Sequence, residues 1–306
     1  MKRLAPAVAA LLLAAAAQAQ LKDPPPAPDG RPATAEEFEA RLKPQHGEIK
    51  LPNGIATLSL GDDFYYLSPS DAEYLLTVGW GNPPGNKTLG MIMPQGLSPV
   101  RRGAWGVIIH YSDDGHVSDD NAAKIDYAKL LSDMQSAEPD INQKRQEKGY
   151  PPVHVVGWAA APYYDAQTHK LYWAKDVKIG DASEDTLNYD IRVLGRKGVL
   201  ELDAVAGIDQ FDMIKTQMPK VLAFTNFDQG NRYIDFNPST DKVAAYGLTA
   251  LVAGGIAAKF GLFAKLGLLL LGAKKFLVIG LAAVAAFFRK LFGRGPNKPG
   301  APPKAP

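Results

Sequence analysis

Five side chains able to bind a metal ion or carry a proton lie close together in the chain. They are Asp113, Asp114, His116, Asp119 and Asp120. Oxygen ligands of this kind suit Ca²⁺, but an EF-hand loop also needs acids at alternate positions, a glycine sixth and a glutamate twelfth. The stretch lacks that order. A hairpin turn followed by a helix N-terminus, which acidic side chains stabilise, is therefore the preferred interpretation.

Zinc and thiolate chemistry have no pattern to support them. The chain has no cysteine, and its five histidines form neither an H-E-x-x-H nor an H-x-H pattern. We therefore expect no metal centre and no cofactor.

The stretch GWGNPPGNKTLG, residues 79–90, resembles a phosphate-binding loop only in composition. A P-loop places its lysine directly after the last glycine, whereas Asn86 here separates Gly85 from Lys87. Two prolines also remove N–H donors from the middle of the loop. We expect a turn-rich loop and no bound nucleotide.

Acid–base chemistry has one candidate pair. Glu201 and Asp203 would share one face of a predicted strand, but carboxylates that alternate with apolar residues also mark an ordinary half-exposed strand. No G-x-S-x-G motif is present, and the S-x-x-K pattern from Ser239 to Lys242 lies beside the apolar end of the chain. A hydrolase or metal-dependent enzyme that uses the carboxylates of Asp113, Asp114 and Asp119, or of Glu201 and Asp203, remains the alternative to a binding protein.

Aromatic side chains gather on one predicted hairpin, at residues 153–179, and could present a surface to a ligand or partner. Packing into a core is the commoner reason for such a group. The candidate binding residues of the whole chain are Trp80, Asn82, Asp113, Asp114, Trp158, Tyr163, Asp165 and Trp173.

The elements that would position these residues begin with a hairpin. Two short strands flank Pro52-Asn53-Gly54, and Ser68 or Ser70 begins a short helix that ends at Gly79. A strand at 105–111 and a turn at 113–115 follow. A helix is predicted from about Asp120 to Lys148, with a break before Pro139.

Successive strands and turns dominate the second half. Four apolar runs between residues 153 and 207 predict an antiparallel meander, and an amphipathic helix at 209–224 would cover it. Residues 232–236 could add a strand. The fold class is therefore α+β: a meander sheet with an N-terminal hairpin and packed helices, followed by apolar C-terminal helices. By analogy alone, this order is similar to the α/β/α sandwich of photosystem extrinsic proteins.

Both ends of the chain indicate export and membrane anchoring. Lys2 and Arg3, an apolar run and Ala17-Gln18-Ala19 predict a signal peptide cleaved after Ala19. Residues 243–288 contain no acid and four lysines, which favours one span plus a membrane-associated helix over a two-span hairpin. The predicted domains are a signal peptide at 1–19, a Pro-rich spacer at 20–44, an exported domain at 45–241, a membrane region at 242–292 and a basic tail at 293–306.

The net charge of +2 conceals two oppositely charged parts. All 32 acidic residues lie at or before Asp241. Between the predicted signal peptide and Asp241 there are only 22 lysines and arginines, so the exported part has a net charge of about −10. A negatively charged surface argues against nucleic-acid binding, because that binding depends on basic side chains that neutralise the phosphates. The basic end suits anionic lipid.

Three stretches carry a resemblance to a known family. They are GYPPVHVVGWAAAPYYDAQTHKLYWAKDV, LNYDIRVLGRKGVLELDAV and DKVAAYGLTALVAGGIAAKFGLFAKLG. Residues from about Gly47 to Arg294 resemble the bacterial family of membrane-anchored proteins known as a domain of unknown function, number 2167 in that series. The resemblance implies an anchored topology and supplies no catalytic residue. The family places a tyrosine where this chain has His116, which weakens a role for that histidine.

The sequence thus favours a non-catalytic binding or scaffold protein in the bacterial envelope. Its main domain is expected in the periplasm and its C-terminal region in the inner membrane. The expected partners are the lipid bilayer and either an envelope protein or a second copy of the chain, without nucleic acid or nucleotide.

Overall fold

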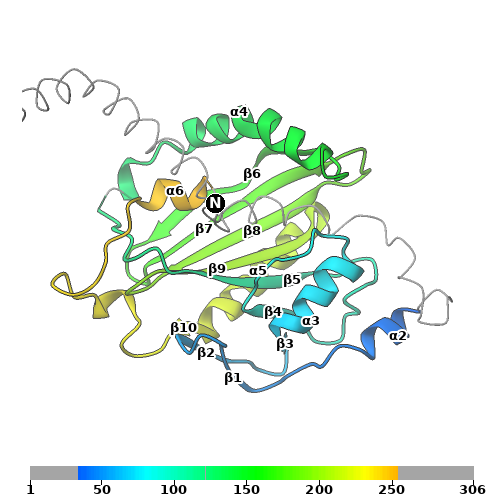
Figure 1. Ribbon diagram of the computed structural model, residues 1–306, viewed down its shortest axis with the longest axis horizontal. Coiled ribbons are helices and arrows are strands. Elements are labelled where there is room, and N and C mark those ends of the chain that lie inside the picture. The colour runs from blue at the N-terminus through cyan, green and yellow to red at the C-terminus, as the bar shows by residue number, and fades with distance from the viewer. Residues whose placement is uncertain (1–33, 121, 254–306) are drawn as a thin grey trace, which may run out of the picture. The chain divides into compact units, whose positions relative to one another are not determined.

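The computed structural model describes residues 34–120 and 122–253, which form two antiparallel sheets with helices around them (Figure 1). The smaller sheet has the order β1-β2-β10. Its strands are β1 (Glu48–Lys50), β2 (Ala56–Ser59) and β10 (Thr225–Phe227). The predicted hairpin is confirmed: β1 pairs with β2 in the register Glu48 to Ser59, and Gly54 adopts φ 67° in the turn.

The larger sheet has seven strands in the order β3-β4-β5-β9-β8-β7-β6. All of its neighbouring strands run antiparallel, and its last four along the chain form the predicted meander. The α+β class is therefore confirmed. The strands are β3 (Phe64–Leu67), β4 (Gly90–Pro94), β5 (Gly106–Ser112), β6 (Val153–Asp165), β7 (Lys170–Ile179), β8 (Thr186–Leu194) and β9 (Val199–Gly207).

The short helix after β3 follows the sequence prediction closely. Ser68 caps α3 (Pro69–Tyr74), and a π-helical turn, η3 (Leu75–Gly79), completes it at the expected glycine. The Ser68 side chain accepts a hydrogen bond from the backbone N–H of Asp71, as an N-cap should.

Helix α4 (Tyr127–Gln146) corrects two expectations. It begins later than Asp120, after a 3₁₀ turn η4 (Ala122–Lys124), and it continues through Pro139 without the predicted break. Its tertiary contacts explain the continuity. Asn142 donates to the carbonyl of Val153 at 2.9 Å and accepts from its N–H at 2.8 Å, so α4 satisfies backbone groups at the edge of β6.

The segment around Tyr233 is a second correction. Residues 232–236 form no strand: Tyr233–Asp235 is a 3₁₀ turn, η6, because Asp235 accepts hydrogen bonds from the backbone N–H groups of Gly230 and Arg232. The carboxylate thereby holds the chain in a tight turn. The strand that follows α5 is instead β10, which pairs with β2.

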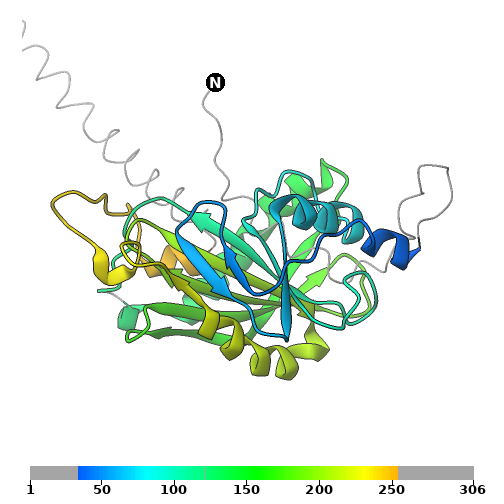
Figure 2. The ribbon, with the colours of Figure 1, turned by 90° about the horizontal axis from the view of Figure 1, so that it is seen from below.

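Both faces of the seven-stranded sheet are covered. Helix α5 (Phe211–Phe224) packs Ile214, Met218 and Val221 on one face, with a 3₁₀ turn η5 (Ile208–Gln210) before it. Figure 2 shows α3 on the opposite side of the sheet from α5. On the face away from α5 lie two apolar clusters, one around α3 and one containing residues of α4 and α6 (Leu248–Val252).

The folded unit extends beyond both predicted domain boundaries. Within the predicted spacer, α2 (Ala35–Glu39) buries Phe38 in the cluster around α3. Beyond Asp241, α6 buries Leu248, Leu251 and Val252 beside Trp173 of β7. These apolar residues belong to the core, which corrects the expectation that the chain enters the bilayer near Val243.

The predicted membrane spans lie largely outside the described residues. Among residues 34–120 and 122–253, no helix combines the length and apolar character needed to cross a bilayer. The signal peptide at 1–19 and the tail at 293–306 also lie outside the described residues.

Candidate functional site

The loop at 79–90 binds an anion, and the anion is a side chain of the same protein. The carboxylate of Glu73 accepts hydrogen bonds from the backbone N–H of Gly85 at 2.5 Å and of Asn86 at 3.1 Å, and from the Asn86 amide at 3.1 Å. Converging N–H groups of this kind form an anion-binding turn. Because Glu73 fills it, the loop has a structural role.

The two candidate residues in this loop are buried. Trp80 is packed in the cluster around α3 and donates from its indole N–H to the carbonyl of Pro99 at 2.8 Å, so it is a core residue. Asn82 is also buried, and its side-chain amide has no hydrogen-bond partner. Neither residue offers a surface for a partner.

The acidic stretch does not converge on one point. Asp113 is exposed, while Asp114 accepts hydrogen bonds from the hydroxyls of Tyr246 at 2.8 Å and Ser112 at 3.0 Å. Asp120 accepts from Ser118. Within residues 34–120 and 122–253, no three histidine or carboxylate side chains are placed to hold a metal ion.

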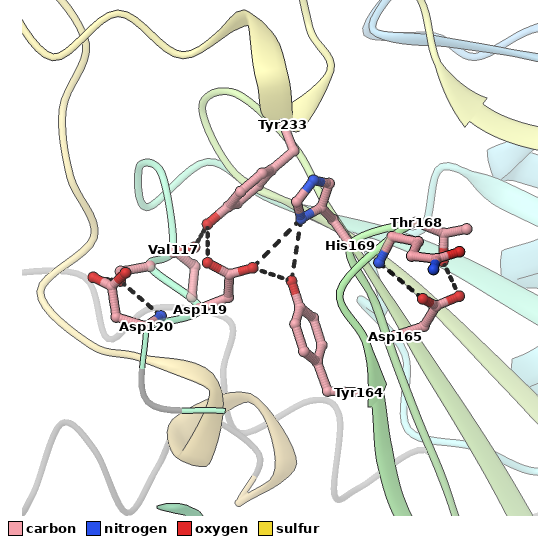
Figure 3. Close-up of polar contacts among 10 residues, drawn as sticks. Val117, Asp119, Asp120, Tyr164, Asp165, Thr168, His169 and Tyr233 are labelled. Carbon is pink, nitrogen blue, oxygen red and sulfur yellow. Dashed lines mark hydrogen bonds and ion pairs between the residues drawn. The ribbon is translucent and has the colours of Figure 1, made fainter. Parts of the chain in front are cut away.

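Asp119 lies instead at the centre of an aromatic cluster (Figure 3). One carboxylate oxygen accepts from the hydroxyl of Tyr233 at 3.0 Å, and the other accepts from the hydroxyl of Tyr164 at 2.5 Å. Nδ1 of His169 lies 3.4 Å from the same oxygen as Tyr164. These contacts tie the loop before η4 to the β6–β7 turn and to η6.

Four rings in series extend this cluster, with two stacked pairs and one tilted pair between them. Ring centroids are 4.1 Å apart from His169 to Tyr233, 4.3 Å from Tyr233 to His116 and 3.9 Å from His116 to Phe236. His116 is buried, and burial lowers its pKa. We call Asp119, Tyr164, His169, Tyr233, His116 and Phe236 the ring cluster.

Hydrogen bonds and burial shift the pKa values of Asp119, Tyr164 and Tyr233 in the ring cluster. Burial acts to raise the pKa of Asp119, but hydrogen bonds from Tyr164 and Tyr233 outweigh it, and the net pKa is lowered. Burial and the Asp119 carboxylate raise the pKa of both tyrosines. Near neutral pH the carboxylate therefore stays ionised and the phenols stay protonated, and the pKa values of all three groups are shifted away from the neutral range that favours acid–base catalysis.

The aromatic candidates on the β6–β7 hairpin divide between core and surface. Trp173 is buried, and Trp158 is half-buried with its indole N–H donating to the carbonyl of Tyr127. Tyr163 is 62% exposed and stacks on Tyr172. Asp165 holds the β6–β7 turn by accepting from the backbone N–H of Gln167 and the hydroxyl of Thr168.

A buried group of charges lies on the sheet face away from α5. Arg192 donates to Asp203 at 2.6 Å and lies 3.3 Å from Asp190 and 3.7 Å from Glu201. Lys175 lies 3.1 Å from Asp190. We call these five residues the charge network. The guanidinium of Arg192 also stands over the ring of Trp173, 5.0 Å from its centroid.

Burial determines the electrostatics of the charge network. Desolvation raises the pKa of Asp190 to about 6, Lys175 opposes that rise and Asp203 adds to it. Desolvation also raises the pKa of Glu201, against the opposing effect of Arg192. The pKa of Arg192 is raised because the surrounding carboxylates outweigh its desolvation. The guanidinium therefore stays charged.

Sequence reasoning found only part of these two groups. It singled out Glu201 and Asp203 but expected them on a half-exposed strand, and that expectation is wrong because the strand is covered on both faces. The same alternation of polar and apolar residues occurs on β8, where the polar residues are Asn188, Asp190 and Arg192. This pattern could have indicated that the charge network extends to β8. Nothing local in the sequence links Tyr233 to Asp119.

No curated protein matches the chain. The solution structure of cyanobacterial PsbP (CyanoP) from Synechocystis sp. PCC 6803 is similar at 11% identity and a TM-score of 0.33, covering 61% of this chain and 92% of that one. A likeness this distant carries no functional inference.

A family model described as "Protein of unknown function (DUF2167)" matches residues 43–285. The match spans most of the chain, including both the ring cluster and the charge network, and it confirms the resemblance found in the sequence. The chain belongs to the DUF2167 family.

Proposed function

We propose that this protein is anchored in the inner membrane of the bacterial envelope and presents its folded unit, outside the cytoplasm, as a binding domain without catalytic activity. The observation that carries the anchoring is the continuity of α6 with the apolar end of the chain. Leu248, Leu251 and Val252 are buried in the fold, and the sequence from Gly254 to Phe288 has no acidic residue.

The position of α6 supports one membrane span over two. With α6 in the core, about 35 residues remain between Gly254 and Phe288. One span takes about 20 apolar residues, so this length suffices for one span and a shorter helix but not for two spans and a turn. Only Ala253 separates α6 from that stretch in the sequence.

The charges at the two ends support the orientation. A signal peptide would carry the folded unit across the membrane, and the basic residues after Phe288 would stay on the cytoplasmic side. Both features together support a periplasmic location for the main domain.

The hydrogen bonding and burial of the candidate carboxylates favour a binding function over catalysis. Each oxygen of the Asp119 carboxylate accepts a hydrogen bond from a tyrosine, and the carboxylates of the charge network are at most 19% exposed around Arg192. A binding surface is available on β6, the edge strand. Val156 and Tyr163, which are 53% and 62% exposed, both lie on it, and the partner would be an envelope protein or a second copy of the chain.

The alternative is an envelope hydrolase that uses Glu201 and Asp203. One observation favours it: both carboxylates converge on Arg192 beside Asp190, whose pKa is raised. Burial weighs against it, because a substrate would have to reach side chains that are at most 19% exposed.

A single set of fusions and cross-links tests the proposal. Alkaline phosphatase fused after Ile256 should be active in cells, whereas a cytoplasmic reporter at the same position should be inactive. The full chain, carrying a photo-reactive residue in place of Tyr163, should cross-link to a discrete partner. The exposed Thr216 on α5 is the matched control position. An inactive phosphatase would contradict export, and equal cross-linking from both positions would contradict a binding surface on β6.

A further inference from the structure

The charge network contains one more negative group than positive groups. Its cations are Lys175 and Arg192, and its carboxylates are Asp190, Glu201 and Asp203, with every side chain at most 19% exposed. A surplus charge in such a site is strongly unfavourable unless a proton or another ion neutralises it. The structure therefore requires one further positive charge at this place.

Two of the carboxylates face each other directly. Asp190 on β8 pairs in register with Asp203 on β9, and both side chains point to the face away from α5. Directly opposite residues of an antiparallel pair place their Cβ atoms about 5 Å apart, which brings two carboxyl groups within hydrogen-bond reach. Asp190 is 4% exposed and Asp203 is 7% exposed.

Arg192 satisfies only one oxygen of each carboxylate. It donates from Nη1 to Oδ1 of Asp203 at 2.6 Å and from Nη2 to Oδ1 of Asp190 at 3.3 Å. Both Oδ2 atoms are buried and have no hydrogen-bond partner. Nζ of Lys175 lies 3.1 Å from Oδ2 of Asp190, close enough for an ion pair but without hydrogen-bond geometry.

No other described group that faces the network supplies the missing positive charge. His110 on β5 lies opposite Glu201, and burial together with Arg192 lowers its pKa to about 4, so it is neutral near neutral pH. Asp114 and Tyr246, which interact with Glu201 electrostatically, add no positive charge.

We propose that Asp190 and Asp203 form a buried proton-binding site, in which one carboxyl group, protonated at Oδ2, donates a hydrogen bond to Oδ2 of the other. A single proton taken up from solvent would neutralise the surplus charge and would satisfy both unpartnered oxygens. No bond other than O–H forms or breaks. The inference concerns the folded unit alone and does not depend on the proposed binding function.

The direction of the Asp190 titration agrees with this geometry. Its pKa is raised to about 6, mainly by burial, whereas an aspartate in an unfolded chain titrates near 4. Between about pH 4 and 6 the folded state thus binds a proton that the unfolded state has lost. Stability from this site is fully present below about pH 4 and is lost as the pH rises through about 6. In an exported domain, external acid would set the occupancy of the site.

Infrared spectroscopy of the full chain in detergent micelles tests the proposal directly. At about pH 6, where Asp190 should be about half protonated, the protein should show the C=O stretch of a protonated carboxyl group, and at about pH 8 that band should be gone, since ordinary carboxylates are almost fully ionised at both values. Protein that contains aspartate labelled with ¹³C at its side-chain carboxyl group should show the band at a lower frequency. The band should disappear in Asp190→Asn and in Asp203→Asn and should persist in Asp113→Asn, which alters an exposed carboxylate.

The possible contrary results are distinct. Absence of the band in the unaltered protein would overturn the proposal, and would point to a bound cation as the neutralising charge. A band that the aspartate label does not shift would place the proton on Glu201. A band that survives in either Asn variant would show that the proton is not shared.

Stability measurements keep the test decisive if a variant folds poorly. Asparagine keeps the shape of aspartate and brings the net charge of the network to zero. Relative to Asp190→Asn, the unfolding equilibrium constant of the unaltered protein should rise by up to about 100-fold between pH 4 and 7, following tenfold per pKa unit. A ratio that does not change with pH would contradict a proton-binding pair.

Discussion

Asp203 accepts a hydrogen bond from Arg192 over 2.6 Å in a part of the sheet where both side chains are buried. Removing the cation would leave two buried carboxylates and the partly buried Glu201 with Lys175 alone. We expect Arg192→Met to lower the free energy of unfolding by about 3–5 kcal/mol near neutral pH, because an uncompensated buried charge is costlier than a lost pair. Urea unfolding at about pH 5 and 8 measures the effect.

The loss in Arg192→Met should be smaller at acid pH, where protonation of Asp190 relieves the repulsion. Arg192→Lys is the matched control, since it keeps the charge but loses the second donor nitrogen. A loss for Arg192→Met that is equal at both pH values would contradict the electrostatic explanation and indicate lost packing against Trp173.

The carboxylate of Glu73 organises the loop at 79–90. Glu73→Gln would keep one acceptor oxygen but would place an amide N–H₂ against the N–H of either Gly85 or Asn86, so we expect a stability loss of about 1–3 kcal/mol. Faster hydrogen exchange at those two amides would show the change directly. Asp62→Asn, at an exposed site, controls for the lost charge. Unchanged exchange in Glu73→Gln would show that the turn is stable without its anion.

The parts of the fold that were predictable are those with local causes. Asn53-Gly54 forms its turn through backbone conformation, and Ser68 caps α3 through its own side chain. Strands β3 and β4 were not anticipated because all of their residues are buried, so neither has the alternating pattern that marks a half-exposed strand.

The candidate site was less predictable than the fold. Asp190 meets Asp203 only through the β8–β9 register, and Asp119 meets Tyr233 across more than a hundred residues. Whether a carboxylate on β9 is exposed depends on helices far away in the chain. For this reason, alternation on β8 and β9 predicted the shared face correctly but not its burial.

Asn142 protects the edge of the seven-stranded sheet. Its amide exchanges two hydrogen bonds with the backbone of Val153, and both groups are buried. Asn142→Ala would leave that N–H and carbonyl unpaired, and we expect a loss of about 1–3 kcal/mol together with greater self-association through β6. Chemical denaturation and sedimentation measure the two effects. Monomeric behaviour of Asn142→Ala at full stability would contradict this role.

The ring cluster should give a pH dependence opposite to that of the charge network. The lowered pKa of Asp119 means that its stabilisation is present above the pKa of an unfolded aspartate, about 4, and is lost as the pH falls through the folded value. The stability difference between the unaltered protein and Asp119→Asn should therefore be greatest near neutral pH and shrink below about pH 4. Tyr233→Phe removes one of the hydrogen bonds and should show a smaller difference. A difference that grows with acidity would contradict the assignment.

Helix α6 decides where the folded unit ends. A chain truncated after Ile256 keeps Leu248, Leu251 and Val252 in the core, whereas one truncated after Asp241 loses them. Burying such side chains contributes about 1.5–3 kcal/mol each, a large fraction of the 5–15 kcal/mol typical of a domain. We therefore expect the longer chain to unfold cooperatively in urea and the shorter one to be largely unfolded, as followed by circular dichroism. Leu251→Ala in the longer chain should cost about 2–5 kcal/mol. Equal stability of the two truncated chains would show that α6 does not stabilise the folded unit, and the membrane region would then begin at residue 242 as the sequence predicts.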